Sequence, residues 1–165
     1  QFPANFMFVA AMNPCPCGYA FHQDQRCKCS ALSIQRYQNR ISGPLLDRID
    51  LHIDGPPLPA EELQSRLPAE NSATVRARVI QAYEQQIKRQ GMLNSALSPQ
   101  DLEQYACLNA QAQQILSLAQ QRLNLSARGY HRVLRVARTI ADLNLSANIE
   151  SAHVTEALSY RGATQ

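Results

Sequence analysis

Four of the five cysteines in this 165-residue chain lie within fifteen residues, and they form two close pairs. The pairs are Cys15-Pro-Cys17 and Cys27-Lys-Cys29, with nine residues between them. Two thiolate pairs joined by a short loop can surround one tetrahedral Zn²⁺ ion, because each pair supplies two ligands from one turn of the backbone. The spacing therefore predicts a structural zinc site, since four thiolates leave no coordination position open for a substrate.

Two alternatives to zinc stay open: reduced or redox-active thiols, and disulfides. A Cys-x-Cys spacing is tighter than the ~2–4 residues that usually separate zinc ligands, so the motif is less specific. We expect no secretory leader, and Cys107 makes the cysteine count odd, which disfavours a full set of disulfides. His22 is a possible substitute ligand that we expect to be exposed, and we expect Cys107 to lie in the core.

The composition favours an ordered protein that does not cross a membrane. Hydrophobic residues make up 45% of the chain, which is enough for a core, and no apolar run approaches the ~18 residues of a membrane span. We therefore expect no membrane partner and a cytoplasmic location. The net charge of +3 is only mildly basic, and it does not by itself indicate nucleic-acid binding.

The chain divides into three sections by composition. Residues 1–56 mix strand and helix signals, residues 57–71 form a proline-containing connector, and residues 72–165 contain helix signals only. Apolar runs predict strands at Phe6–Met12 and Leu51–Ile53. The first of these resembles a buried strand with almost nothing before it, so we expect the chain to be a piece of a longer protein.

Helices are predicted from apolar residues at three- and four-residue spacing and from the residues that cap helices. Ser98-Pro99 is typical of a helix start, and Gly91 is typical of a helix end. The predicted helices cover about 34–40, 72–90, a segment from 98, about 109–123, a segment from 126, and about 151–160. Short amphipathic helices with short loops predict a small helical bundle.

The helix predicted from Ser126 carries four arginines and no acid between residues 128 and 138. They are Arg128, Arg132, Arg135 and Arg138. A guanidinium group favours bidentate contacts with phosphate or carboxylate, but the simpler interpretation of such a run is a solvated basic face. We expect Arg132, Arg135 and Arg138 to be structural or surface residues.

Three motifs carry a family resemblance. They are Ala11-Met-Asn-Pro14, Ser42-Gly-Pro-Leu-Leu-Asp-Arg-Ile-Asp50 and Ser126-Ala-Arg128, in this order along the chain. With them the sequence resembles the magnesium-chelatase-like AAA+ ATPases of bacteria, of the competence-associated ComM type, over nearly its whole length. It is similar, more distantly, to magnesium-chelatase ATPase subunits and minichromosome maintenance helicases.

The resemblance implies catalytic roles for three residues. Asn13 matches sensor 1, which orients the attacking water near the γ-phosphate of ATP. Arg48 matches the arginine finger that is offered to the neighbouring subunit's nucleotide. Arg128 matches sensor 2, a lid arginine that binds the γ-phosphate. A positioned arginine at a transferring phosphoryl group is worth ~10³–10⁵ in rate in related NTPases.

Each of these residues also has an ordinary interpretation. Asn13 before Pro14 can end a strand with a turn. Arg48 lies between Asp47 and Asp50, so a local ion pair would explain it. Arg128 can be a solvated residue at a helix start.

The fold implied by the resemblance is mainly α. An all-α helical lid bundle, at 72–165, is preceded by the C-terminal α/β remnant of an AAA+ core at 1–56. The 165 residues contain no Gly-x-x-x-x-Gly-Lys-Ser/Thr loop and no apolar run ending in paired acids that would hold Mg²⁺. We therefore expect this chain alone neither to bind ATP tightly nor to hydrolyse it.

The resemblance implies that the intact protein binds ATP and Mg²⁺, self-associates into a hexameric ring, and is a DNA helicase that promotes branch migration in natural transformation. Two alternatives stay open. One is a metal-chelatase motor that acts on a protein partner, and the other is a non-enzymatic module that binds zinc and nucleic acid.

Overall fold

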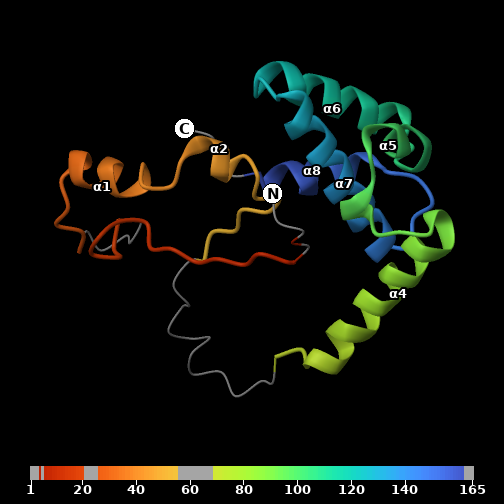
Figure 1. Ribbon diagram of the computed structural model, residues 1–165, viewed down its shortest axis with the longest axis horizontal. Coiled ribbons are helices and arrows are strands. Elements are labelled where there is room, and N and C mark those ends of the chain that lie inside the picture. Colours follow the sequence, from red (N-terminus) through yellow and green to blue (C-terminus); the bar gives the residue numbers. More distant parts are fainter. Residues whose placement is uncertain (1–3, 5, 21–25, 56–68, 162–165) are drawn as a thin grey trace. The chain divides into compact units, whose positions relative to one another are not determined.

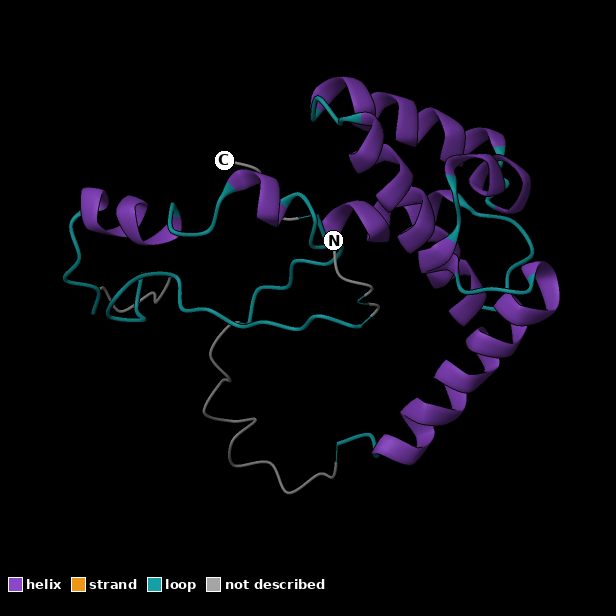
Figure 2. Ribbon diagram, viewed as in Figure 1, coloured by secondary structure: helices purple, strands orange, loops and turns teal. Residues whose placement is uncertain are grey.

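The computed structural model describes residues 4, 6–20, 26–55 and 69–161 (Figure 1). The chain divides into two compact units, Gln1–Arg48 and Ile49–Gln165. Among the described residues the regular elements are helices, and no strand is present (Figure 2). The fold is mainly α, as predicted, and the predicted connector lies largely outside the described residues.

The first unit contains two short helices, α1 (Ala31–Gln38) and α2 (Gly43–Leu46). The side chain of Ser30 accepts a hydrogen bond from the backbone N–H of Ser33 at 3.3 Å and so caps α1. For this reason α1 begins before residue 34, where the apolar spacing places the predicted helix. No prediction covers α2, because a single turn of four residues has no recognisable apolar period.

The two predicted strands do not form. Residues 6–12 are irregular and exposed, with 88% of the Met7 surface accessible, and residues 51–53 are irregular as well. A strand needs a neighbouring backbone to pair its N–H and C=O groups, and no described segment offers one. The backbone N–H of His52 instead donates to the carbonyl of Tyr160 at 2.7 Å.

The second unit is a bundle of five α-helices and one 3₁₀ helix among its described residues. They are α4 (Ser72–Gln90), η1 (Asn94–Ala96), α5 (Pro99–Tyr105), α6 (Ala110–Arg122), α7 (Ala127–Leu143) and α8 (Ser151–Ser159). The predicted caps are present. Ser98 and Asp101 form a reciprocal capping box, Ser126 caps α7, and Gly91 ends α4 with a φ of 73°. The predicted helices of this unit are therefore confirmed.

Helix α7 organises the core, because it packs against α4, η1, α5 and α8, while α6 packs against α8. The apolar residues spaced three and four apart along α7 face this core: Val133, Leu134, Ala137 and Ala141 are buried, and Tyr130 is half-buried. The buried apolar cluster of the unit comprises Leu97, Leu102, Ala106, Ala112, Leu116, Leu125, Val133, Leu134, Ala137, Ile140, Ala141, Ile149, Val154 and Ala157.

Helix α4 contacts the bundle through its C-terminal part, and its N-terminal part projects away from the other helices (Figure 1). The buried residues of this helix are Ala82 and Gln86. The apolar row at Val75, Val79 and Tyr83 is exposed. None of the described helices has the length and apolar character needed to cross a bilayer.

Candidate functional site

The four cysteine sulfurs converge in the first unit. The Sγ atom of Cys15 lies 3.3 Å from that of Cys17 and 3.8 Å from that of Cys27, and the Cys17 and Cys27 sulfurs are 3.6 Å apart. With Cys29 included, all four sulfurs lie within 4.8 Å of one another. Four sulfurs bound to one zinc ion at the usual bond length of about 2.3 Å lie about 3.8 Å apart. The cluster therefore has the size of a tetrahedral four-thiolate site.

A tight turn holds the first cysteine pair. The backbone N–H of Gly18 donates to the carbonyl of Cys15 at 3.0 Å, and Gly18 has a φ of +83°, which glycine adopts without steric cost. Cys15 is fully buried. The side chain of Gln38 in α1 donates to the carbonyl of Pro14 at 3.1 Å, so the turn is joined to α1.

The cysteine thiols of the cluster have unequal acidities. Hydrogen bonds from the backbone of Tyr19 and from Cys15 lower the pKa of Cys17 to about 6. The hydrogen bond between Cys29 and Cys17 raises the pKa of Cys29 to about 12. Negative charge is thus placed on Cys17 first, and a bound cation would have to displace protons from its neighbours.

The sequence analysis also makes predictions for His22 and Cys107. His22 lies outside the described residues. Cys107 is exposed, and its thiol lies 3.5 Å from the carbonyl of Gln104, so the prediction of a core cysteine is wrong. The reason is that Cys107 follows the C-terminal end of α5 and lies outside the helix face that packs on α7.

Asn13 lies beside the first cysteine turn. A Cβ atom added to Gly18 would lie 3.9 Å from Cγ of Asn13, so the Asn13 side chain lies beside that turn. Asn13 is exposed. Its amide is therefore both close to the cysteine cluster and accessible to a ligand.

Arg48 is the last residue of the first unit. Its guanidinium is exposed and donates from Nη1 to the carbonyl of Pro44 at 3.1 Å. The carboxylate of Asp50, one of the two acids proposed above as its local partner, binds Arg132 instead, with 2.8 Å between Oδ1 and Nε.

Arg128 belongs to the second unit and lies in the first turn of α7. Ser126 caps this turn by accepting from the N–H of Gly129 at 3.1 Å, and the turn contains no acid. Arg128 is exposed and has no hydrogen bond or ion pair within the described part of the chain. Its charge stands at the end of the helix where backbone N–H groups already favour an anion.

The other three arginines of α7 turn into the protein. Arg132 is buried and donates to Asp50 and to the carbonyl of Ile49. Arg135 is half-buried and donates to the carbonyl of Leu97 at 2.6 Å. The prediction of a solvated basic face is therefore wrong for these residues, whereas their structural role is confirmed.

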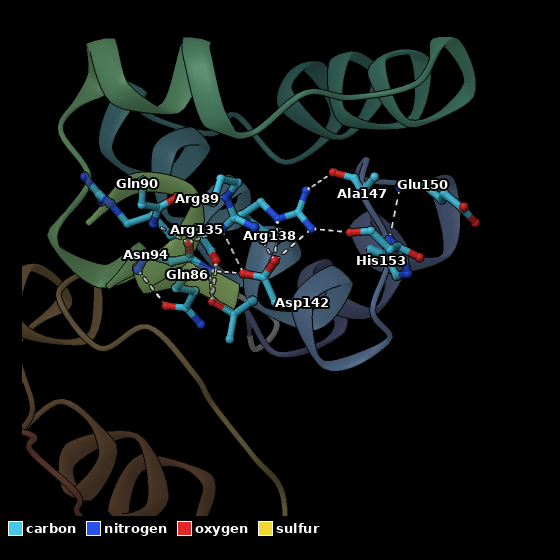
Figure 3. Close-up of polar contacts among 12 residues, drawn as sticks. Gln86, Arg89, Gln90, Asn94, Arg135, Arg138, Asp142, Ala147, Glu150 and His153 are labelled. Atoms are coloured by element: carbon cyan, nitrogen blue, oxygen red, sulfur yellow. Dashed lines mark hydrogen bonds and ion pairs between the residues drawn. The ribbon is translucent and has the colours of Figure 1, made fainter. Parts of the chain in front are cut away.

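Arg138 is fully buried in a polar network that the sequence analysis does not anticipate (Figure 3). Asp142 accepts from Nε of Arg138 at 3.1 Å, from Nη2 of Arg89 at 2.9 Å and from Nδ2 of Asn94 at 2.8 Å. Burial lowers the pKa of Arg138, and the charge of Asp142 opposes that effect. The four-residue spacing of Arg138 and Asp142 was the available signal, because such residues are neighbours on a helix.

The guanidinium of Arg161, a residue that follows α8, lies against α7 at Gly129. A methyl group at position 129 would collide with Nη1 of Arg161, so glycine at this position lets the Arg161 guanidinium lie on the helix surface. Gly129 follows Arg128 directly. A glycine inside a predicted helix was the only sequence signal of this close approach.

Comparison with known proteins gives matches to both parts of the chain. The family described as magnesium chelatase, subunit ChlI C-terminal, matches residues 69–161, and the family described as magnesium chelatase, subunit ChlI, matches residues 1–63. Competence protein ComM of Haemophilus influenzae is 45% identical over 162 residues, which cover 98% of this chain and 31% of that protein.

Two further relatives are the YifB proteins of Escherichia coli and Salmonella typhimurium. They are 43% and 42% identical over 161 residues, which cover 97% of this chain and 31% of each relative. The chain thus spans about a third of the length of these curated relatives.

Proposed function

Because this chain belongs to the magnesium-chelatase-like family of AAA+ ATPases, of the ComM type, we propose that it supplies the sensor, arginine-finger and lid parts of an ATP-driven motor. The observation that carries the proposal is the exposure of Arg128. Of the four arginines in α7, three make internal hydrogen bonds, whereas Arg128, at the capped start of the helix, has no hydrogen bond or ion pair among the described residues.

Three residues have the proposed roles. Arg128 binds the γ-phosphate of ATP from the lid, and Asn13 orients the attacking water. Arg48 stabilises the charge on the nucleotide of the neighbouring subunit. The exposure of all three side chains supports these roles, because each must reach a ligand outside the described chain.

ATP and Mg²⁺ act in the whole protein. The 165 residues lack the loop that cradles phosphates, so the nucleotide is held mainly by other parts of the protein or by its neighbour. The proposed assembly is a ring, in which one subunit's Arg48 completes the site of the next subunit. Binding ATP between subunits couples hydrolysis to movement of the lid.

For the whole protein we propose a hexameric DNA helicase that promotes branch migration during natural transformation. The support is the name of one relative, Competence protein ComM of Haemophilus influenzae, together with the identity over nearly the whole chain. The second candidate is a motor that acts on a protein partner in metal chelation, and it is supported by the description of the matched family. The two candidate functions can be distinguished by measuring whether DNA or a chelatase partner subunit stimulates the ATPase activity of the whole protein.

The test is Arg48→Ala in the whole protein, with Arg122→Ala as the control. Arg122 is exposed in the last turn of α6 and has no proposed role. We expect Arg48→Ala to reduce ATP turnover by ~10³-fold or more while ATP binding persists, because the finger acts on the transition state. Turnover at the control's level would show that Arg48 is not the finger.

A further inference from the structure

We propose that Cys15, Cys17, Cys27 and Cys29 bind a single Zn²⁺ ion through four thiolates, and that this ion fixes the turn beside which Asn13 lies. The metal site stands on the geometry of the sulfurs. The importance of the Asn13 position for ATP hydrolysis rests on the proposed function.

The distances between the sulfur atoms fit one shared ion. Three of the sulfur pairs, at 3.3, 3.6 and 3.8 Å, lie at or up to 0.5 Å below the separation of about 3.8 Å expected around a single tetrahedral zinc. A disulfide needs sulfurs about 2.05 Å apart, and all four cysteines are free. The arrangement therefore fits a shared central cation better than two S–S bonds.

The charge and exposure of the cluster also suit zinc. Soft thiolate ligands in a tetrahedral set favour zinc or iron–sulfur chemistry, and four of them complete the coordination shell of zinc. Cys15 is fully buried, Cys27 and Cys29 are half-buried, and Cys17 is exposed. An ion at the centre is thus shielded on one side and remains reachable from the solvent side, which allows it to be loaded and removed.

The ion would join the turn at Cys15 and Cys17 to the segment that leads into α1. Cys15 and Cys17 lie in the turn beside Asn13, whereas Cys29 immediately precedes Ser30, the cap of α1. The side chain of Gln38 in α1 also donates to the carbonyl of Pro14 at 3.1 Å. A single hydrogen bond restrains the turn less than four metal–sulfur bonds would, so the ion would be the main restraint on the position of Asn13.

The first test is the metal content of the purified chain. We expect one zinc ion per chain in the unaltered protein and in Cys107→Ser, which removes an exposed thiol outside the cluster. We expect no bound zinc after Cys17→Ser with Cys29→Ser. These two positions are chosen because neither side chain is buried, whereas a substitution at Cys15 would disturb a packed residue.

Cobalt provides a second measurement that does not depend on metal acquired during expression. Co²⁺ added to the metal-stripped chain should give the thiolate charge-transfer absorption and visible bands of a tetrahedral four-sulfur site, and added Zn²⁺ should abolish them. The double variant should show neither. Three outcomes would overturn the zinc site. They are an absence of metal in both experiments, stoichiometric iron in place of zinc, and a molecular mass of the chain that shows disulfides.

Hydrogen exchange tests the structural role. Removal of zinc by a chelator should speed amide exchange in residues 14–20 and in α1, while α7 and α8 in the other unit should keep their protection. Unchanged exchange around the turn would overturn the proposal that the ion fixes Asn13. If zinc is bound and the turn is ordered, but Arg48→Ala leaves ATP turnover intact, the proposed motor function fails and the metal site stands.

Discussion

Nε of Arg132 lies 2.8 Å from Oδ1 of Asp50, and this contact joins the segment that follows Arg48 to α7, the helix with Arg128 in its first turn. Arg132 also donates to the carbonyl of Ile49. Its side chain is only 10% exposed, although that of Asp50 is 64% exposed. The residues directly after the proposed finger are thus held by the helix that carries the proposed sensor 2.

Arg132→Ala should release the segment at 49–52 and lower the stability of the second unit. Hydrogen bonds to charged groups contribute about 1.5–3 kcal/mol each, and the exposed Asp50 can be rehydrated, so we expect a loss of about 1–3 kcal/mol. Urea unfolding measures the loss, and hydrogen exchange should show faster exchange at His52, whose N–H donates to Tyr160.

The functional consequence of the same change is a lower ATP turnover with little effect on ATP affinity in the whole protein. Arg132 does not need to touch nucleotide for this result, because it would act by positioning Arg48. Asp50→Asn is the matched variant, since it keeps a hydrogen-bond acceptor and should have a smaller effect. Equal ATP turnover in the unaltered protein and in Arg132→Ala would show that the contact has no part in positioning the finger.

Asp142→Ala should destabilise the second unit more than Arg138→Met. Asp142 accepts hydrogen bonds from both Arg138 and Arg89, so its loss leaves two cations without their carboxylate. Breaking a buried ion pair costs about 3–5 kcal/mol, and we expect Asp142→Ala to fall in this range. Arg138→Met leaves Asp142 paired with Arg89 and should cost less.

The control for this pair is Glu70→Ala. Glu70 binds Arg78 in an exposed ion pair, with side chains 43% and 56% accessible, and such pairs contribute only about 0–1 kcal/mol. Thermal or urea unfolding of the three variants should therefore rank Asp142→Ala first and Glu70→Ala last. The reverse order of Asp142→Ala and Arg138→Met would contradict the interpretation that Asp142 is the shared anion.

Lowering the pH should reduce the stability of α5, because it protonates the carboxylate of Asp101. Hydrogen bonds from the Ser98 hydroxyl and backbone lower the pKa of Asp101 from its usual 3.8. The ionised carboxylate therefore contributes stability above the pKa of the unfolded chain, and this contribution is lost as the pH falls through the lower, folded pKa. NMR titration of the Asp101 side chain should show this pKa below 3.8, and Ser98→Ala should bring it closer to that value.

Gly91→Ala should destabilise the end of α4 by about 1–2 kcal/mol, because an L side chain is disfavoured in the left-handed conformation. Gly91 has a φ of 73°, and no atom would lie within 4 Å of an added Cβ. Any effect is therefore conformational and not a collision. Gly91→Asn is the matched control, since asparagine tolerates this conformation and should cost less in urea unfolding.

The helices of the second unit were predictable because their boundaries depend on local chemistry. Ser98, Ser126 and Gly91 act on backbone groups within a few residues, so a short stretch of sequence contains the relevant information. The cysteine cluster was predictable for a similar reason, since two close pairs can meet across one loop.

The burial of arginines and the absence of strands depend on distant residues and were not predictable in this way. Arg138 is buried beside Asp142 on the same helix, and Asp142 in turn binds Arg89 of α4 and Asn94 of η1, which are distant in the sequence. The apolar segment at 6–12 has strand character, but a strand forms only beside another strand. The roles proposed for Asn13, Arg48 and Arg128 depend on the family resemblance and could not be derived from local physical chemistry.

The exposed apolar residues at 6–12 affect how the isolated chain must be handled. Successive side chains, from Phe6 to Val9, are all apolar, so the segment can adhere to another copy by either side. Aggregates formed in this way would grow without a fixed subunit number and would not need ATP. A sizing experiment on the isolated chain should therefore use low protein concentrations, so that such adhesion is not mistaken for a closed ring.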